Sequence, residues 1–155
     1  MRAMIQAAAM FMILGGPAAA APAGAQESSP QPSPTRQAFE HYEVVRTALS
    51  ADQLGGVAPH ARLLAEQVEA VGGAEAKKAA EALVAARTLD DARTAFGNLS
   101  TILVPIFQAE AIPGTTAYMC AMKQKPWVQR GDKAENPYYG KSMLTCGSVL
   151  PAKGK

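Results

Sequence analysis

The chain has 155 residues, 48% of them hydrophobic and 18% charged, and this length allows one domain of ordinary size. Only 6% are aromatic, so the core must be built mainly from alanine, leucine and valine, which suits closely packed helices. The formal net charge of +2 is too small to indicate a nucleic-acid-binding protein on electrostatic grounds. No apolar run of 18 residues follows the N-terminal segment, which excludes a membrane span in the remaining chain.

The N-terminal segment, residues 1–25, predicts a cleaved signal peptide. Arg2 supplies the basic start, an apolar stretch runs to Leu14, and two glycines and a proline follow. Ala23-Gly24-Ala25 then matches the small-x-small cleavage rule. An uncleaved anchor is the alternative, which the short and interrupted apolar stretch disfavours. We therefore expect an exported, periplasmic protein with a mature chain of residues 26–155.

Residues 26–37 form a polar segment with prolines at positions 30, 32 and 34. A segment of this composition buries too little apolar surface to fold and favours extended polyproline conformations. We expect a disordered, proline-rich linker between the signal peptide and the folded domain.

Helical periodicity dominates from Ala38 onward. Apolar residues recur every three or four positions, which is the spacing of a helix with one buried face. Helices connected by short loops imply an antiparallel bundle. The predicted fold class is therefore all-α, a small antiparallel bundle of three to four helices with an irregular C-terminal tail, residues 115–149, packed on it. The helices are expected over 38–49, 54–71, 75–86 and 89–106, with Leu64, Phe96, Leu99 and Leu103 buried.

The tail differs from the helical part in composition. It contains both cysteines and the only tryptophan, and from residue 115 onward the chain has seven basic residues against two acidic ones. Tyr118 and Trp127 are each compatible with a short strand, and Ser142 to Cys146 with one helical turn. Trp127 and the pair Tyr138-Tyr139 are expected to dock the tail onto the bundle.

Four sulfur-containing side chains in the tail indicate a soft-metal site. Met119-Cys120-Ala121-Met122 and Met143-Leu144-Thr145-Cys146 each pair a thiol with a thioether, in mirrored order. Such ligands favour Cu(I), whereas a zinc site would need four cysteine or histidine ligands and a hard cation clustered carboxylates. If the two segments meet, Cys120, Met122, Met143 and Cys146 could bind one ion.

The same residues allow simpler interpretations. Two cysteines in an exported domain commonly form a disulfide, here Cys120–Cys146, and they could also remain free thiols. Methionines often fill gaps in a core. A reducible disulfide could release metal ligands, so the disulfide and the metal site are compatible.

The two histidines are further candidate ligands. His41 lies at the edge of the first helix's apolar face, where it either meets a partner segment or is solvated. His60 follows Pro59 at a helix start, where a solvated histidine without a metal-binding role is the simpler interpretation. The sequence has no phosphate loop, Ser-His-Asp set, HExxH or CxxCH motif, and no CxxC that would support a thiol redox enzyme. We therefore expect no enzymatic activity.

Several short motifs together match a known family pattern over about residues 38–149, most specifically in the tail. They are His41-Tyr42, Ala48 to Asp52, Gly56-Val57, Cys120-Ala121-Met122, Trp127, Gln129 and Asn136 to Gly147. On these residues the chain resembles an uncharacterised bacterial periplasmic domain that occurs alone or appended to the adaptor subunits of copper/silver-type heavy-metal efflux pumps. Ala121 stands where the family usually has proline, which makes this loop less rigid.

The resemblance implies a helical domain associated with the handling of copper or related metals. Carried over by position, Cys120, Met122, Met143 and Cys146 match the family's sulfur residues, and His41 matches its histidine in the first helix. We therefore expect a periplasmic Cu(I)-binding protein in metal handling, efflux or resistance, with a heavy-metal efflux adaptor or another periplasmic protein as partner. The alternative is a non-catalytic interaction module with a structural Cys120–Cys146 disulfide.

Overall fold

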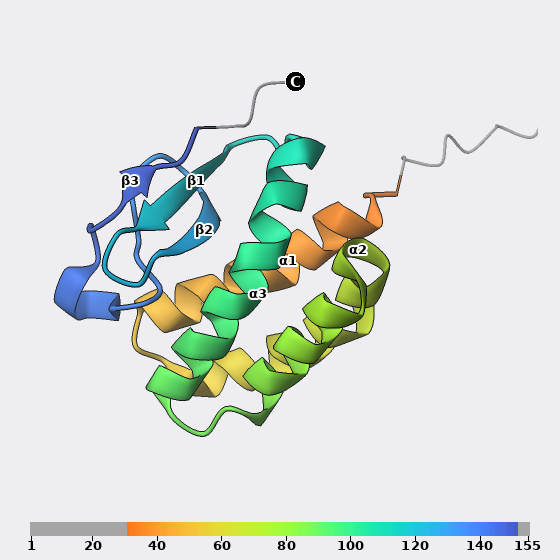
Figure 1. Cartoon of the computed structure of the whole chain (residues 1–155), viewed down its shortest axis with the longest axis horizontal. Coiled ribbons are helices and arrows are strands. Elements are labelled where there is room, and N and C mark those ends of the chain that lie inside the picture. The colour runs from red at the N-terminus through yellow and green to blue at the C-terminus, as the bar shows by residue number, and fades with distance from the viewer. Residues whose placement is uncertain (1–30, 152–155) are drawn as a thin grey trace, which may run out of the picture. The chain divides into compact units, whose positions relative to one another are not determined.

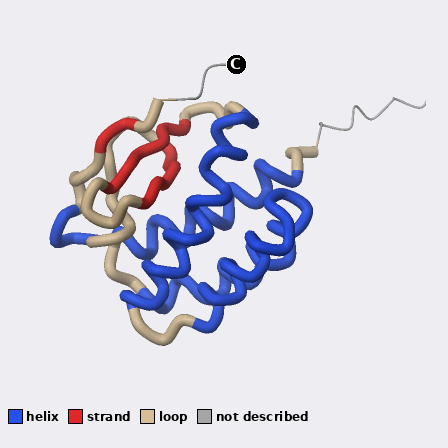
Figure 2. The backbone as a smooth tube through the Cα atoms, in the orientation of Figure 1, coloured by secondary structure: helices blue, strands red, loops and turns tan. Residues whose placement is uncertain are grey.

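The computed structural model describes residues 31–151, which form three α-helices and a three-stranded antiparallel sheet (Figures 1 and 2). The fold is therefore α+β, and the predicted all-α class is wrong. The error lies in the tail, which is expected to be irregular: the short strands considered at Tyr118 and Trp127 are present and pair, with a third strand, into a sheet. In chain order the elements are α1 (Pro34–Ser50), the 3-10 helix η1 (Leu54–Gly56), α2 (Val57–Ala85), α3 (Leu89–Glu110), β1 (Thr115–Cys120), β2 (Lys125–Arg130), the 3-10 helix η2 (Gly140–Met143) and β3 (Ser148–Val149).

Helix α1 begins within the segment predicted as a linker. The Ser33 side chain accepts a hydrogen bond from the backbone N–H of Arg36, and Pro34 occupies the first turn, where its missing N–H costs nothing. The helix thus starts four residues before the expected boundary at Ala38. The predicted signal peptide, residues 1–25, lies outside the described residues.

Helix α2 joins the second and third predicted helices. Gly73 interrupts it with φ 74° and ψ −171°, a conformation that is accessible to glycine because it has no Cβ. The sequence therefore places the break correctly. Helix α3 starts at the cap Thr88, whose hydroxyl accepts from the N–H of Asp91, and continues past Pro105 to Glu110.

The sheet has the order β2-β1-β3, and all pairs are antiparallel. β1 and β2 pair along their whole length, from Thr115 opposite Arg130 to Cys120 opposite Lys125. On the other side of β1, Met119 pairs with Ser148 of β3. Threonine, tyrosine, tryptophan and valine in β1 and β2 are residues that favour strands. The strands are short, which explains why periodicity alone did not define them.

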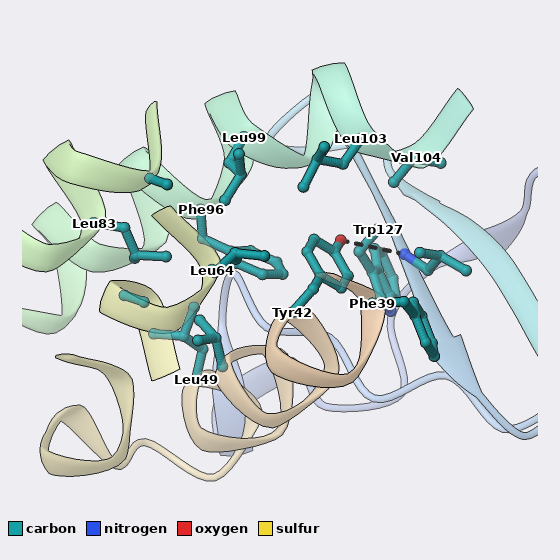
Figure 3. Close-up of a cluster of buried hydrophobic side chains, with 14 of the residues drawn as sticks. Phe39, Tyr42, Leu49, Leu64, Leu83, Phe96, Leu99, Leu103, Val104 and Trp127 are labelled. Atoms are coloured by element: carbon teal, nitrogen blue, oxygen red, sulfur yellow. Dashed lines mark hydrogen bonds between the residues drawn. The ribbon is translucent and has the colours of Figure 1, made fainter. Parts of the chain in front are cut away.

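Aromatic residues join the helices to the sheet in one core (Figure 3). The hydroxyl of Tyr42, on α1, lies 2.8 Å from the hydroxyl of Ser100 on α3 and accepts a hydrogen bond of 3.4 Å from the N–H of Val128 on β2. Trp127 and Tyr138 are buried, as expected for residues that dock the tail. The predicted core residues Leu64, Phe96, Leu99 and Leu103 are all fully buried, which confirms the helical faces assigned from sequence.

None of the helices within residues 31–151 is both long and apolar enough to cross a membrane.

Two adjacent leucines of α2 test this packing. Leu64 is fully buried and Leu63 is 41% exposed. Leu64→Ala should lower the free energy of unfolding by about 2–5 kcal/mol, because it removes buried methyl groups and leaves a cavity. Leu63→Ala should change it by less than about 1 kcal/mol. Urea unfolding followed by circular dichroism measures both, and equal losses would show that the buried face of α2 is wrongly assigned.

Candidate metal centre

The two cysteines lie at the same end of the sheet. Cys120 is the last residue of β1 and is fully buried, whereas Cys146 follows η2 and is half-buried. Both are free thiols. Since Met119 pairs with Ser148, continuing the antiparallel register past this pair brings Cys120 to the segment that contains Cys146.

The side-chain amide of Asn136 connects the two cysteines. Its nitrogen Nδ2 donates to the carbonyl oxygen of Cys146 at 2.7 Å and lies 3.6 Å from the sulfur Sγ of Cys120. Both cysteines are therefore within reach of one nitrogen atom. This contact fixes the backbone at Cys146 next to the buried thiol.

The other polar groups of Asn136 are also paired. Its Oδ1 accepts from the N–H of Tyr138 at 2.8 Å, its N–H donates to the carbonyl of Leu144 at 2.7 Å, and its carbonyl accepts from the N–H of Gly140 at 3.2 Å. Asn136 is fully buried, and a buried polar group left without a partner costs free energy. These bonds close the segment from Asn136 to Cys146 into a compact loop.

Two arginines attach this loop to the helices. Arg46 of α1 is only 3% exposed and donates from Nη1 to the carbonyl and the carboxylate of Glu135, at 3.2 and 3.0 Å. Arg93 of α3 donates to the carbonyl of Pro137 at 3.1 Å and forms an ion pair with Asp52. The hydrogen bond from Arg93 holds the pKa of Asp52 below its ordinary value, so this carboxylate stays charged. Asn136 is thus anchored from both α1 and α3.

Glycine is required at two positions of the loop. Gly140 has φ 53°, and a Cβ there would collide with the carboxylate of Asp52. A Cβ on Gly147 would collide with the ring of Trp127, so the chain beside Cys146 packs directly on the indole. Trp127 in turn stacks on Tyr118, with ring centroids 5.1 Å apart. The position of Cys146 is therefore set by the aromatic core under the sheet.

The two predicted methionine ligands border the cysteines. Met122 is 63% exposed in the turn between β1 and β2, which begins right after Cys120. Met143 ends η2 and is half-buried, and its carbonyl accepts from the N–H of Cys146 at 3.0 Å. Both thioethers thus belong to turns next to the thiols.

His41 belongs to a different part of the molecule. It lies on α1 with its Nδ1 3.3 Å from Nδ1 of His60 on α2. Over residues 31–151, no group of three or more histidine, cysteine, aspartate or glutamate side chains is arranged to hold a metal ion. The structure therefore joins His41 to His60 and does not bring it to the two cysteines.

The buried hydroxyls nearby are structural. Burial raises the pKa of Tyr42 and of Tyr138 well above the ordinary tyrosine value, so both stay protonated at neutral pH. The Tyr138 hydroxyl donates to the carbonyl of Pro126. Neither group can act as a proton acceptor in this range of pH.

Sequence reasoning missed three residues that shape these sites. Asn136 is expected only as one residue of the segment that carries the family resemblance, although it stands before Pro137 and between the two cysteines in the sequence. His60, expected from its position after Pro59 to be an ordinary histidine at a helix start, lies against His41. Gly147 carries no sequence signal for its close contact with Trp127.

Comparison with protein-family models, curated proteins and solved structures gives no match to this chain. The fold and the site define a small α+β domain that holds two free thiols at one end of its sheet, with thioethers in the adjoining turns.

Replacing Asn136 tests the bridge between the cysteines. Asn136→Ala removes the donor to Cys146 and the acceptor for Tyr138, and it should destabilise the protein by at least about 1–3 kcal/mol. It should also speed the reaction of the Cys120 thiol with a disulfide reagent, because the segment that covers this thiol loosens. Urea unfolding and thiol-labelling mass spectrometry measure the two effects.

Asn98→Ala is the matched control, since Asn98 is exposed and its side chain accepts from Lys125 at 3.1 Å. This variant should be close to wild type in both measurements. If Asn136→Ala behaved like Asn98→Ala, Asn136 would not hold the two segments together.

Proposed function

We propose that this protein binds a soft metal ion, Cu(I), through Cys120 and Cys146 and takes part in metal handling in the periplasm. The observation that carries the proposal is that a single amide nitrogen, that of Asn136, contacts both the thiol of Cys120 and the backbone carbonyl of Cys146, and both cysteines are free. The two cysteines are 26 positions apart in the sequence, and the buried side chain of Asn136 connects their two segments.

The chemistry of the donors supports Cu(I) over other ions. Thiolates and thioethers are soft ligands that favour Cu(I), and Met122 and Met143 lie in the turns next to the cysteines. A structural zinc site takes four cysteine or histidine ligands, and only two cysteines are present here. The site also lacks the clustered oxygen ligands that calcium or magnesium needs.

The burial of the donors suggests how an ion would enter. Met122 is exposed and Cys146 half-buried, so an incoming ion would reach these two residues before Cys120. Cys120 is covered, and its sulfur is in contact with the Asn136 amide. For an ion to reach Cys120, the contact between its sulfur and the Asn136 amide must be broken, so metal entry competes with this contact.

The resemblance to domains appended to heavy-metal efflux adaptors suggests the partner. We propose that the protein passes its ion to such an adaptor or to another periplasmic protein, without catalysing a reaction. The same approach of the cysteines also favours a second candidate, an interaction module stapled by a Cys120–Cys146 disulfide. A disulfide requires Cα atoms within about 7 Å, which a shared amide contact is consistent with.

Competition titration with a Cu(I) chelator, under reducing and anaerobic conditions, tests the proposal. Wild type should bind one equivalent of Cu(I), and Cys120→Ser or Cys146→Ser should weaken binding strongly because each removes a thiolate. Replacing Met122 and Met143 with leucine keeps volume and apolarity, so the fold should lose little while Cu(I) affinity falls.

Met119→Leu is the matched control. Met119 is adjacent to Cys120 in β1, and successive side chains of a strand point to opposite faces. This change should leave Cu(I) affinity unaltered. Equal affinity in wild type and both cysteine variants would overturn the metal proposal. A purified protein two hydrogens lighter than its sequence mass, and unable to bind Cu(I) even after reduction, would favour the disulfide module.

A further inference from the structure

The two histidines of the described chain face each other across the contact between α1 and α2. His41 and His60 have their Nδ1 atoms 3.3 Å apart and their ring centroids 5.5 Å apart, with the ring planes inclined at 43°. Both side chains are partly exposed, so solvent can reach the pair. The soft-metal function proposed above does not use this pair.

We propose that His41 and His60 form a second metal site, which binds a divalent ion of the zinc type between α1 and α2. This site is separate from the cysteines and takes a different class of ion. Whether this site binds its ion is therefore independent of Cu(I) binding at the cysteines.

The distance between the two nitrogens fits a shared ion. Zinc binds histidine nitrogen at about 2.0–2.1 Å with tetrahedral geometry, so two such nitrogens lie about 3.3–3.4 Å apart. The observed separation of 3.3 Å already has this value. The two helices would need no rearrangement to admit the ion, because only small rotations of the rings are required to aim both lone pairs at it.

The chemistry of the pair also suits a cation. Without an ion, a contact between two Nδ1 atoms needs a single proton, donated by one imidazole and accepted by the other. A metal ion can take the place of that proton and bind both nitrogens. Burial and the neighbouring His60 lower the pKa of His41, which favours the neutral, ligating form, and the nearby negative charge of Glu40 attracts a cation.

The ion class follows from the ligand type. Imidazole suits zinc and Cu(II), whereas the thiols and thioethers at the end of the sheet favour Cu(I). Two protein ligands are half of what a closed structural zinc site takes, so water would fill the remaining positions, for which the partial exposure of both histidines leaves room. The result is an accessible, exchangeable site rather than a closed structural one.

Zinc titration with a chromophoric chelator tests this site. The purified protein carrying Cys120→Ser and Cys146→Ser is used, so that the thiols cannot contribute. It should bind one equivalent of Zn²⁺, and either His41→Ala or His60→Ala in the same background should weaken binding at least about tenfold, because changing residues that merely orient a ligand already costs that much.

Thermal unfolding gives a second readout. An ion bound only by the folded state raises the melting temperature, so Zn²⁺ should stabilise the protein with both histidines but not the single variants. Without zinc, the variants should melt close to their parent, which shows that they fold. Zinc binding and stabilisation that persist in the His41→Ala and His60→Ala variants would overturn the proposal, as would a parent protein that binds no zinc. Loss of Cu(I) binding in the cysteine variants leaves this result untouched.

Discussion

The structure of the C-terminal segment depends on one buried side chain, Asn136. All its polar groups are satisfied by partners within a segment of about ten residues or by the cysteines on either side. A buried amide with several partners is stable in one arrangement only, because each lost partner leaves an unpaired polar group. The same residue therefore fixes the loop, places Tyr138 in the core and holds Cys146 beside Cys120. Asn136 therefore specifies both the local fold and the geometry of the candidate site.

The helices hold the loop around Asn136 in place. Arg46 and Arg93 bind the backbone of the residues on either side of Asn136, and the hydroxyl of Tyr42 binds the backbone of β2. The helical layer thus holds the sheet and the loop by directed polar contacts as well as by apolar packing. The cysteines are presented by a rigid support, while Met122 in the exposed turn is left accessible.

The helical part of the fold could be predicted because its signal is local. Apolar spacing predicts the helices and their buried faces, and the break at Gly73 falls in the gap between the helices expected over 54–71 and 75–86. The first turn of the helix expected over 54–71 is instead η1, and α2 begins at Val57. The sheet could not be predicted with the same ease, since β3 has only two residues and exists through its pairing with β1. Hence the all-α prediction failed in the tail.

The candidate site residues also fall into two groups, those with a local sequence signal and those defined only by contacts between distant segments. The mirrored spacing of cysteine and methionine marks two segments that the structure brings together at Asn136, and those residue types carry soft-ligand chemistry. The contact between His41 and His60 could not be found that way, since it depends on how α1 packs against α2. Likewise, the need for glycine at position 147 arises only from the indole that lies against it. Such long-range contacts have no periodicity in the sequence.

The most direct test of the central claim is X-ray absorption at the copper edge of the protein loaded with one equivalent of Cu(I). The account predicts that the ion is surrounded by sulfur alone, and that the spectrum changes in Met122→Leu/Met143→Leu but stays the same in His41→Ala/His60→Ala. Nitrogen ligands that disappear in the histidine variant would contradict it, because they would place Cu(I) between α1 and α2 and leave the two thiols without the role assigned to them.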